Sequence, residues 1–560
     1  MPTQHSDSSA SRAHAGIVVS AGIVSLGVLV SRLTGLLREV AFARYFGAGI
    51  AFDAYVAAFR IPNLMRDLLA EGALSTAFVT VFSQCLSTKG REEAFQLSNR
   101  IVSVLAPLVA LLCVVGIVFA PQIVDAMFPG YAEVPGKKEL TVTMARIMAP
   151  FLLMMALAAN AMGALNAMGR FAIPSLASGC FNITSLATGL VIAFVVGPKL
   201  GLDPIVGMAW GTLLGGVVQY AVHIPGLRAV GLRFRPTFDL SDPALRQVLR
   251  LVGPAVIGAA AVQVNVVVNS NFASQITDAS GAVIDGPVGW LGYAFRFMQL
   301  PLGLFGVAIA SATLPNVSKS AAAGHMDEFR ETLSRSLGLV FLLTLPSAVG
   351  LIVLRRPIVG AIYEHGKFTS FDTEQTSLAL ACYCLGLTAY AGLKIVTPSF
   401  YALNDVRTPA TVAVASIAAN YGLNWMFLNV FGWGHAGLAS STSAVATFNF
   451  LVLFFAIRSR LDGVHGRRLT IGLLKIGLAT AAMGVACHYS SALIQHSFGA
   501  GFVARLVDIA VSIPLGAAIF YWFCSALKVP ELALATDAVV GKALGAIRRA
   551  GYAKIGPGGA

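Results

Sequence analysis

The chain has 560 residues, of which 56% are hydrophobic and only 12% are charged, and its formal net charge is +13. Soluble domains carry about 25% charged residues, so this composition excludes an ordinary soluble enzyme and indicates an integral membrane protein. The 7 cysteines and 9 histidines lack the spacing of zinc or redox motifs, and we expect neither a metal nor another cofactor.

Apolar runs predict the membrane-spanning helices, each of which needs about 20 residues. Runs near this length are 17–34, 101–124, 147–166, 174–197, 205–224, 251–272, 336–354, 376–398, 409–431, 436–457, 469–490 and 501–526. Two more segments, 54–83 and 287–316, are apolar but interrupted by polar residues. We therefore expect an all-α polytopic membrane protein with about fourteen transmembrane helices.

Basic residues are distributed unevenly among the predicted loops. If the N-terminus is cytoplasmic and successive loops alternate sides, most loop Lys and Arg residues are cytoplasmic, whereas few, such as Lys137 and Lys199, lie outside. Cytoplasmic loops of membrane proteins carry this excess. We expect both termini in the cytoplasm, and basic loops that contact lipid headgroups rather than nucleic acid.

Two halves of the chain resemble each other. A displacement of 236 residues places Ala58-Phe59-Arg60 on Ala294-Phe295-Arg296, and Ala164-Leu165-Asn166 resembles Ala402-Leu403-Asn404 at nearly the same displacement. Such repeats are common in secondary transporters. We expect two pseudo-symmetric lobes of about six helices each. The predicted divisions are a disordered tail (1–15), an N-lobe (16–235), a C-lobe (236–461), two extra helices (462–530) and a cytoplasmic tail (531–560).

Arginines stand inside the predicted spans. Arg32 and Arg38 lie in the first span, Arg60 and Arg66 in the second, and Arg296 near the middle of the chain. A charge at the bilayer centre costs roughly 2.5–3.5 kcal/mol, so such residues usually face a water-filled cavity or an ionic partner. Several cations that share one cavity would indicate an anionic cargo.

Prolines interrupt the two polar segments at corresponding places. Pro62 and Pro301 each remove a backbone donor and bend or unwind a helix. Broken helices in two repeated halves are the best sequence indication of a transporter's binding site. The predicted loops are mostly too short for an extramembrane domain of about 50 residues. We expect a transporter rather than an enzyme.

A polar stripe follows one face of the second segment. The residues on or near it are Asp53, Arg60, Asn63, Asp67 and Glu71. A spacing of seven keeps residues within about 20° of one another on a helix, so we expect Arg60 to pair with Asp67 and Asp53 to anchor the outer end. Arg66 lies about 100° from Asp67, and we expect it to be less neutralised and to face a cavity.

The two arginines of the first span are separated by six residues, which places them about 120° apart on a straight helix. Arg32 and Arg38 would both face a narrow cavity if Gly35 allowed a bend. In the alternative arrangement, one arginine is functional and the other is interfacial or paired with Glu39.

Several motifs follow one another along the chain in the order typical of one protein family. They are Ser31-Arg32-Leu33-Thr34-Gly35-Leu36-Leu37-Arg38-Glu39, Phe46-Gly47-Ala48-Gly49, Pro62-Asn63-Leu64-Met65-Arg66, Ala70-Glu71-Gly72-Ala73, Gln299-Leu300-Pro301-Leu302-Gly303, Gly366-Lys367-Phe368-Thr369 and His435-Ala436-Gly437-Leu438. From about 17 to 528 the chain resembles the MurJ (MviN) family. These proteins are lipid II flippases of the multidrug/oligosaccharidyl-lipid/polysaccharide (MOP) exporter superfamily.

The resemblance implies fourteen helices, a cationic cavity between two lobes, and a groove near the last two helices for the lipid tail. The implied substrate-binding residues are Arg32, Arg38, Arg66 and Arg296, with Asp53 and Glu71 as acidic positions that the family also uses. We add Glu39, Asn63 and Gln299 as candidate supporting polar residues. Arg60 is not among the family's cavity arginines. Phe295 stands where the family usually has an acidic residue, so Arg296 lacks that expected counter-charge.

These features together predict a flippase of the bacterial inner membrane that moves lipid II from the cytoplasmic to the periplasmic leaflet by alternating access. Guanidinium groups suit the pyrophosphate of such a cargo because they bind phosphate oxygens bidentately. Transport could be coupled to the membrane potential or to a monovalent cation, and cell-wall synthesis proteins are possible partners. The alternatives are a same-fold exporter of another polyprenyl-linked oligosaccharide or a drug, a polyprenyl-lipid-processing membrane enzyme, and a scaffold for cell-wall assembly.

Overall fold

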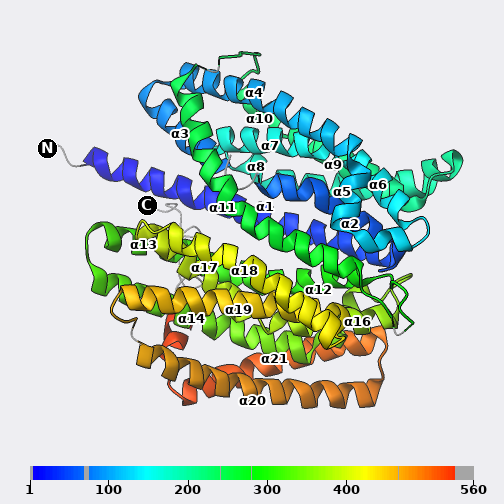
Figure 1. Ribbon diagram of the computed structural model, residues 1–560. Coiled ribbons are helices and arrows are strands. Elements are labelled where there is room, and N and C mark those ends of the chain that lie inside the picture. Colours follow the sequence, from blue (N-terminus) through cyan, green and yellow to red (C-terminus); the bar gives the residue numbers. More distant parts are fainter. Residues whose placement is uncertain (1–3, 69–74, 240, 279, 465, 537–560) are drawn as a thin grey trace, which may run out of the picture. The chain divides into compact units, whose positions relative to one another are not determined.

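The computed structural model describes residues 4–68, 75–239, 241–278, 280–464 and 466–536 (Figure 1). Within these ranges the regular structure is helical, apart from an isolated antiparallel bridge between Thr277 and Val283. The predicted all-α class is confirmed. The predicted C-terminal tail falls largely beyond the described part of the chain.

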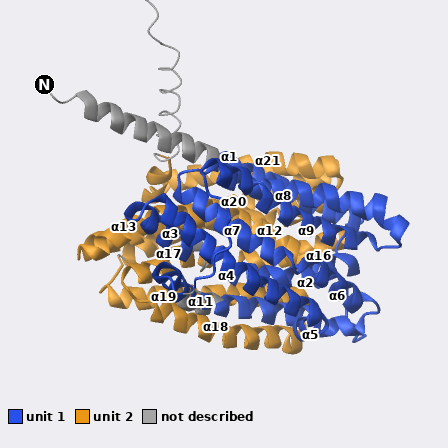
Figure 2. Cartoon of the chain, turned by 90° about the horizontal axis from the view of Figure 1, so that it is seen from above, with its two compact units in different colours: residues 1–289, 365–368 blue, residues 290–364, 369–560 orange. Residues whose placement is uncertain are grey.

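Contacts divide the chain into two compact units, which Figure 2 colours separately. Unit 1 comprises residues 1–289 and 365–368. Its helices are α1 (Gln4–Phe46), α2 (Ile50–Arg66), α3 (Ser75–Thr88), α4 (Arg91–Val118), α5 (Ala120–Met127), α6 (Lys137–Met148), α7 (Phe151–Ala167), α8 (Ala172–Val191), α9 (Pro204–Ala221), α10 (His223–Ala229) and α11 (Pro243–Ser274). The first helix begins at Gln4, so most of the segment predicted as a disordered tail is helical. Extending a nucleated helix adds a hydrogen bond for each residue fixed.

Unit 2 comprises residues 290–364 and 369–560. Its helices are α12 (Pro287–Pro301), whose first turn belongs to unit 1, α13 (Ala308–Ala322), α14 (Met326–Val353), α15 (Arg355–Tyr363), α16 (Ser370–Cys384), α17 (Leu387–Ala402), α18 (Arg407–Trp425), α19 (Gly434–Arg460), α20 (Gly466–Phe498) and α21 (Phe502–Ala526). Buried apolar side chains of α14, α17 and α19, including Phe329, Leu337, Ile395 and Ile457, form its main core.

Among the described residues, 9 helices are long and apolar enough to cross a membrane, or 10 if α16 and α17, bent by 42°, form one span. The other predicted spans coincide with α1, with α2 and α3, with α11 and with α18. These segments carry polar interruptions or include residues outside the described part. The multi-pass architecture is confirmed, and the total of about fourteen spans stays a prediction.

The internal repeat is visible in the helices and in one turn. α4 and α14 have 28 residues each, and a short helix follows each of them. Gly169 (φ 73°) and Asn404 (φ 58°) are left-handed residues in equivalent turns. In these turns the next residue donates its N–H to a carbonyl five positions back, at 2.8 Å and 2.9 Å. This equivalence sets the displacement at 235 positions and corrects the match of Asn166 with Asn404.

The predicted lobe boundary at residue 235 differs from the division into compact units, because α11 packs against α3 and α5 of unit 1. Arg100 of α4 holds the connector before α11 through an ion pair with Asp242 at 2.7 Å. Asp242 also caps α11 by accepting a hydrogen bond from the N–H of Leu245 at 2.8 Å. These contacts tie the start of the second repeat to the first unit.

Small residues allow α8 and α9 to pack closely. A Cβ added to Gly211 would lie 2.4 Å from the carbonyl oxygen of Ser185 and 2.5 Å from Cα of Gly189. A Cβ on Gly207 would meet the backbone of Ala193 at 2.4 Å. Lipid offers helices little hydrophobic drive to associate, so close backbone approach at small residues is a main source of stability.

We expect Gly211→Ala to lower the free energy of unfolding by about 1–3 kcal/mol, because its methyl group would overlap backbone atoms that cannot rotate away. The matched control is Gly116→Ala in α4, where an added Cβ meets no atom within 4 Å. This control should be neutral or stabilising by about 0.5–1 kcal/mol. Thermal unfolding in detergent measures both, and equal effects would contradict the packing argument.

Asp405 closes the turn between α17 and α18. Its carboxylate accepts hydrogen bonds from the hydroxyl of Thr408 at 2.6 Å and from its N–H at 3.0 Å, and it pairs with Arg460. The Thr408 hydroxyl, its N–H and the Arg460 guanidinium lower the pKa of Asp405 from 3.8 to about 2. The folded protein therefore favours the ionised carboxylate more than the unfolded chain does.

Because the pKa of Asp405 is lower in the folded state, its stabilising contribution is present above the unfolded value and is lost as the pH falls toward about 2. We expect Asp405→Asn to unfold at a lower temperature than the wild type near neutral pH. The difference should shrink between about pH 4 and pH 2. Melting curves of the two proteins over this range provide the test, and a gap that does not change with pH would contradict it.

Candidate functional site

The two arginines of α1 have different surroundings. Arg32 is exposed, whereas Arg38 is half-buried and its guanidinium carbon lies 5.1 Å from the ring centre of Phe181 on α8. A guanidinium over an aromatic face is attracted by about 0.5–2 kcal/mol. The structure thus separates the two side chains, as the 120° spacing predicts.

A row of aromatic rings continues from Arg38 through unit 1. Phe181 lies 5.6 Å from Phe151 of α7, which lies 5.5 Å from Phe59 of α2, and Phe59 stacks on Tyr55 at 6.3 Å. The sequence analysis did not single out these rings. Apolar residues on several helices give no sequence signal that they share one row, because their contacts depend on tertiary packing.

Gly35 allows close packing of α1 against α8. A Cβ at this position would lie 3.3 Å from Nδ2 of Asn182, and the same amide donates to the carbonyl of Ser31 at 3.1 Å. Helix α1 continues through Gly35 and ends at Phe46. Gly35 therefore has a packing role, and the helix is not broken at the position where the sequence allowed a bend. Glu39 is half-buried on the same helix.

The structure corrects the predicted charge pairing on α2. Arg66 donates to Oδ1 of Asp67 from Nη2 at 3.1 Å and from Nε at 3.4 Å, with side chains 22% and 34% exposed. We had expected Asp67 to pair with Arg60 and Arg66 to be less neutralised. Asp67, the C-cap of α2, has helical dihedral angles (φ −64°, ψ −35°), so the angular spacing itself holds. The angle is a poor guide because the long arginine side chain can bend toward its sequence neighbour.

The structure places two other predicted residues of this segment within α2. Pro62 is buried inside α2, which continues for one more turn, and Asn63 is half-buried. The predicted acidic residue Glu71 lies outside the described residues. The proposed roles of these side chains stay predictions.

Asp53 is the centre of a buried ionic network in unit 1. Its carboxylate, fully buried, accepts from Nζ of Lys137 at 2.9 Å and from the N–H groups of Gly286 and Gly289 at 2.9 Å and 2.7 Å. Lys137 also donates to Asp285 at 2.7 Å and lies 4.3 Å from the ring centre of Tyr131. The expected anchoring role of Asp53 thus has a specific geometry.

This network fixes the chain where it passes from one compact unit to the other. Gly289 is the last residue of unit 1 in the first pass of the chain, and Trp290 is the first of unit 2. A later short segment, 365–368, also belongs to unit 1, where the N–H of Lys367 donates to the carbonyl of Arg44 at 2.9 Å. The sequence analysis placed Lys137 in an outer loop and did not foresee its burial, because its partners are distant in sequence.

In unit 2, α12 carries the fourth predicted arginine. Arg296 is exposed and Gln299 is half-buried. Phe295, which replaces the acidic residue expected beside Arg296, packs edge-on against Tyr383 at 5.4 Å between ring centres. Helix α12 ends at Pro301 and the chain continues as a π-helical stretch, η5 (Leu302–Val307).

No group of three or more His, Cys, Asp or Glu side chains within the described ranges could hold a metal ion. The four arginines stay the predicted substrate-binding residues. These residues lie on α1, α2 and α12.

Solved structures define the class of protein. An inward-facing multidrug resistance MATE family transporter of the MOP superfamily has a TM-score of 0.64 at 16% identity, over 79% of this chain and 98% of that chain. A structure of lipid II flippase MurJ in an inward closed conformation has a TM-score of 0.72 at 27% identity, over 90% and 99%. The chain therefore shares its fold with a solved lipid II flippase and with a solved MATE family transporter.

Sequence relatives define the family. The model of the family described as lipid II flippase MurJ matches residues 42–508. Lipid II flippase MurJ of Burkholderia cenocepacia is 35% identical over 78% of this chain and 83% of the relative. A probable lipid II flippase MurJ of Vibrio cholerae is 31% identical over 89% and 93%. The chain belongs to the MurJ family.

We expect Asp53→Asn to destabilise the protein by about 3–5 kcal/mol, because it removes the buried charge that faces Lys137 and leaves amide hydrogens against other donors. The matched control is Asp125→Asn, which breaks a more exposed pair with Lys138 (2.7 Å; side chains 47% and 30% exposed) and should cost less than about 1 kcal/mol. Unfolding in detergent compares them. Equal losses would show that the Asp53 network is not a principal anchor.

Proposed function

We propose that this protein is a flippase that carries lipid II across the inner membrane. The observation that supports this most is membership of the MurJ family, whose model matches residues 42–508. Lipid II joins a sugar-peptide headgroup to a polyprenyl tail through a pyrophosphate. The protein breaks no bond in this cargo and so acts as a transporter rather than an enzyme.

The proposed headgroup site uses Arg32, Arg38, Arg66 and Arg296. The planar guanidinium offers paired donors that match phosphate oxygens, and it keeps its charge in an apolar environment. The side chains of Arg32 and Arg296 are exposed, so the protein does not enclose them. Arg66 already shares its charge with Asp67, so cargo binding there involves competition with a carboxylate.

We propose alternating access as the mechanism, in which the site opens first to the cytoplasm and then to the periplasm. Binding of an anionic headgroup neutralises arginines that repel one another, which lowers the energetic cost of bringing them together. The polyprenyl tail stays in lipid, along the groove that the family resemblance assigns to α20 and α21. Closure then depends on the cargo.

The proposed function also has a membrane topology, a driving force and protein partners. The excess of basic residues in alternate loops supports a cytoplasmic N-terminus and C-terminus. An inside-negative membrane potential favours anion export by about 2.3 kcal/mol per charge per 100 mV. Coupling to a monovalent cation is the alternative driving force. Cell-wall synthesis proteins are the proposed partners besides the lipid-linked precursor and membrane lipids.

Depletion of the protein tests the cargo directly. In cells without another flippase, we expect the lipid II that is accessible to periplasmic reagents to fall to background. Continued outward exposure of lipid II would overturn the assignment and favour a same-fold exporter of another polyprenyl-linked oligosaccharide or a drug.

Single alanine variants of Arg32, Arg38, Arg66 and Arg296 test the site. Loss of a charged hydrogen bond costs about 1.5–3 kcal/mol, so we expect at least about tenfold slower flipping at normal protein abundance. Lysine variants should restore part of the activity if charge alone is sufficient.

The matched control for these variants is Arg356→Ala, which removes an exposed arginine that pairs with Glu374 at 2.6 Å on the surface of unit 2. It should flip lipid II at the wild-type rate. If alanine variants of the four arginines behaved like this control, the pyrophosphate site would have to lie elsewhere.

A further inference from the structure

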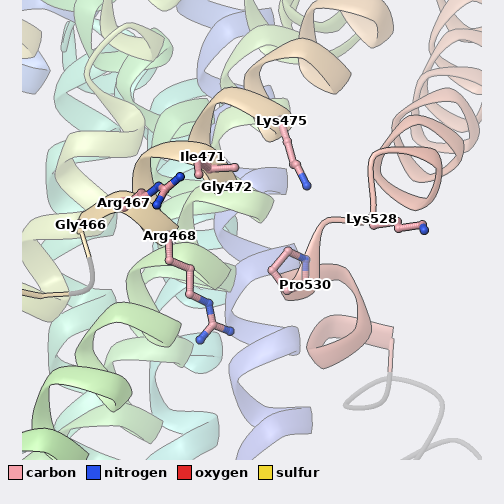
Figure 3. Close-up of a pocket in the computed structure, with 8 residues that line it drawn as sticks. All are labelled: Gly466, Arg467, Arg468, Ile471, Gly472, Lys475, Lys528 and Pro530. Carbon is pink, nitrogen blue, oxygen red and sulfur yellow. The ribbon is translucent and has the colours of Figure 1, made fainter.

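A cationic cavity lies at the start of α20, beside the end of α21. Its volume is about 660 Å³. Its lining residues are Gly466, Arg467, Arg468, Ile471, Gly472, Lys475, Lys528 and Pro530. Figure 3 shows Arg468 and Lys475 on the α20 side and Lys528 with Pro530 across from them. Four of its eight lining residues are basic, and none is acidic.

One face of α20 supplies two of the charges. Arg468, Gly472 and Lys475 are spaced by four and three residues, so they share a face. Lys475 lies about 10 Å farther along the helix than Arg468 and is half-buried. Arg468 pairs with Glu331 at 3.1 Å, and it is the one member of the four cations with an ion pair among the described residues. The buried carboxylate of Glu531 lies behind Gly472, where an added Cβ would be 3.7 Å from both of its oxygens. Glu331 and Glu531 together offset two of the four positive charges, so the cavity keeps a net positive charge.

Lys528 occupies an unfavourable backbone conformation at the opposite wall. Its φ is 51°, in the left-handed region that glycine normally fills just after a helix. The chain here closes α21 with a hydrogen bond from the N–H of Val529 to the carbonyl of Cys524 at 3.0 Å. A lysine at this position bears a conformational cost that glycine would avoid, which points to a use for its side chain.

The surroundings of the cavity match a membrane lipid. Ile471 lines the cavity, and Leu474 and Leu478 continue the same face of α20 with 69% and 59% exposure. On α21, Tyr521 and Trp522 are also exposed, and such aromatic residues concentrate at the headgroup level of membranes. Apolar surface next to a cluster of cations fits a ligand with an anionic head and acyl chains.

We propose that this cavity binds the phosphate headgroup of an anionic phospholipid, whose acyl chains lie against Leu474 and Leu478. The site uses none of the four arginines proposed for the cargo. The cargo's pyrophosphate offers similar chemistry, so the test must separate the two sources of phosphate. A bound phospholipid would hold the two C-terminal helices in a lipid environment of defined charge.

The test uses the purified full-length protein in detergent and native mass spectrometry, with phosphatidylglycerol, phosphatidylcholine and inorganic pyrophosphate as probes. We expect phosphatidylglycerol to bind more tightly than phosphatidylcholine. Each basic residue near a membrane surface contributes a factor of about five in affinity for anionic lipid. Lys475→Ala and Lys528→Gly should therefore each weaken phosphatidylglycerol binding about fivefold.

Two controls separate binding from folding and from general charge. Lys528→Gly should melt at the wild-type temperature or higher, because glycine accepts the left-handed conformation. Lys319→Ala removes an exposed cation at the end of α13 and should leave phosphatidylglycerol binding unchanged. An equal loss in the Lys319 variant, or equal affinity for the two phospholipids, would overturn the proposal.

If inorganic pyrophosphate displaced phosphatidylglycerol and lost its own affinity in the Lys475 and Lys528 variants, the cargo headgroup would be the better ligand and the phospholipid proposal would be wrong. None of these outcomes bears on the flippase assignment, which the depletion experiment and the arginine variants test separately.

Discussion

The dominant constraint on this molecule is the cost of placing charge in an apolar environment. A buried charge needs a partner or hydrogen bonds from groups already held in place. Asp53 meets this requirement fully, with Lys137 and two backbone N–H groups as donors. Arg38 lies over the Phe181 ring, and Arg66 pairs with its neighbour Asp67. Arg32 and Arg296 are exposed instead. The charged residues of the membrane region thus fall into a structural group and an accessible group.

The structural group stabilises the path of the chain. Asp53 accepts a hydrogen bond from the N–H of Gly289 in the first turn of α12. Helix α12 then continues into unit 2, where it carries Arg296. Small residues at the α8–α9 contact and the capped connector before α11 add rigidity around unit 1. Rigid anchors of this kind matter for a transporter, because a rocking motion requires lobes that keep their internal structure while the connections between them move. The buried network at the unit boundary marks one such fixed point.

The sequence was sufficient for features that depend on local pattern. Apolar runs located the helices, motif spacing identified the family, and repeated residues revealed two related halves, although the turn at Gly169 and Asn404 was needed to set the register. Features that depend on distant partners were not predictable. Lys137 reads as a loop cation, yet it is 1% exposed because Asp53 and Asp285 surround its ammonium. The Arg66–Asp67 pair was missed because angular spacing describes the positions of Cα atoms, whereas a long arginine side chain can bend to reach its neighbour.

The proposed cargo site and the cavity at α20 differ in the kind of basic residue they use. In the proposed cargo site the cations are arginines, whereas the cavity at α20 combines Arg467 and Arg468 with Lys475 and Lys528. A guanidinium fork binds a phosphate in a defined orientation, while a lysine ammonium acts as a flexible point charge. Oriented binding suits a cargo that must trigger a conformational change, since only contacts that differ between two states can shift their populations. A lipid headgroup that exchanges with the bilayer needs no fixed orientation, so point charges on flexible stems are sufficient there.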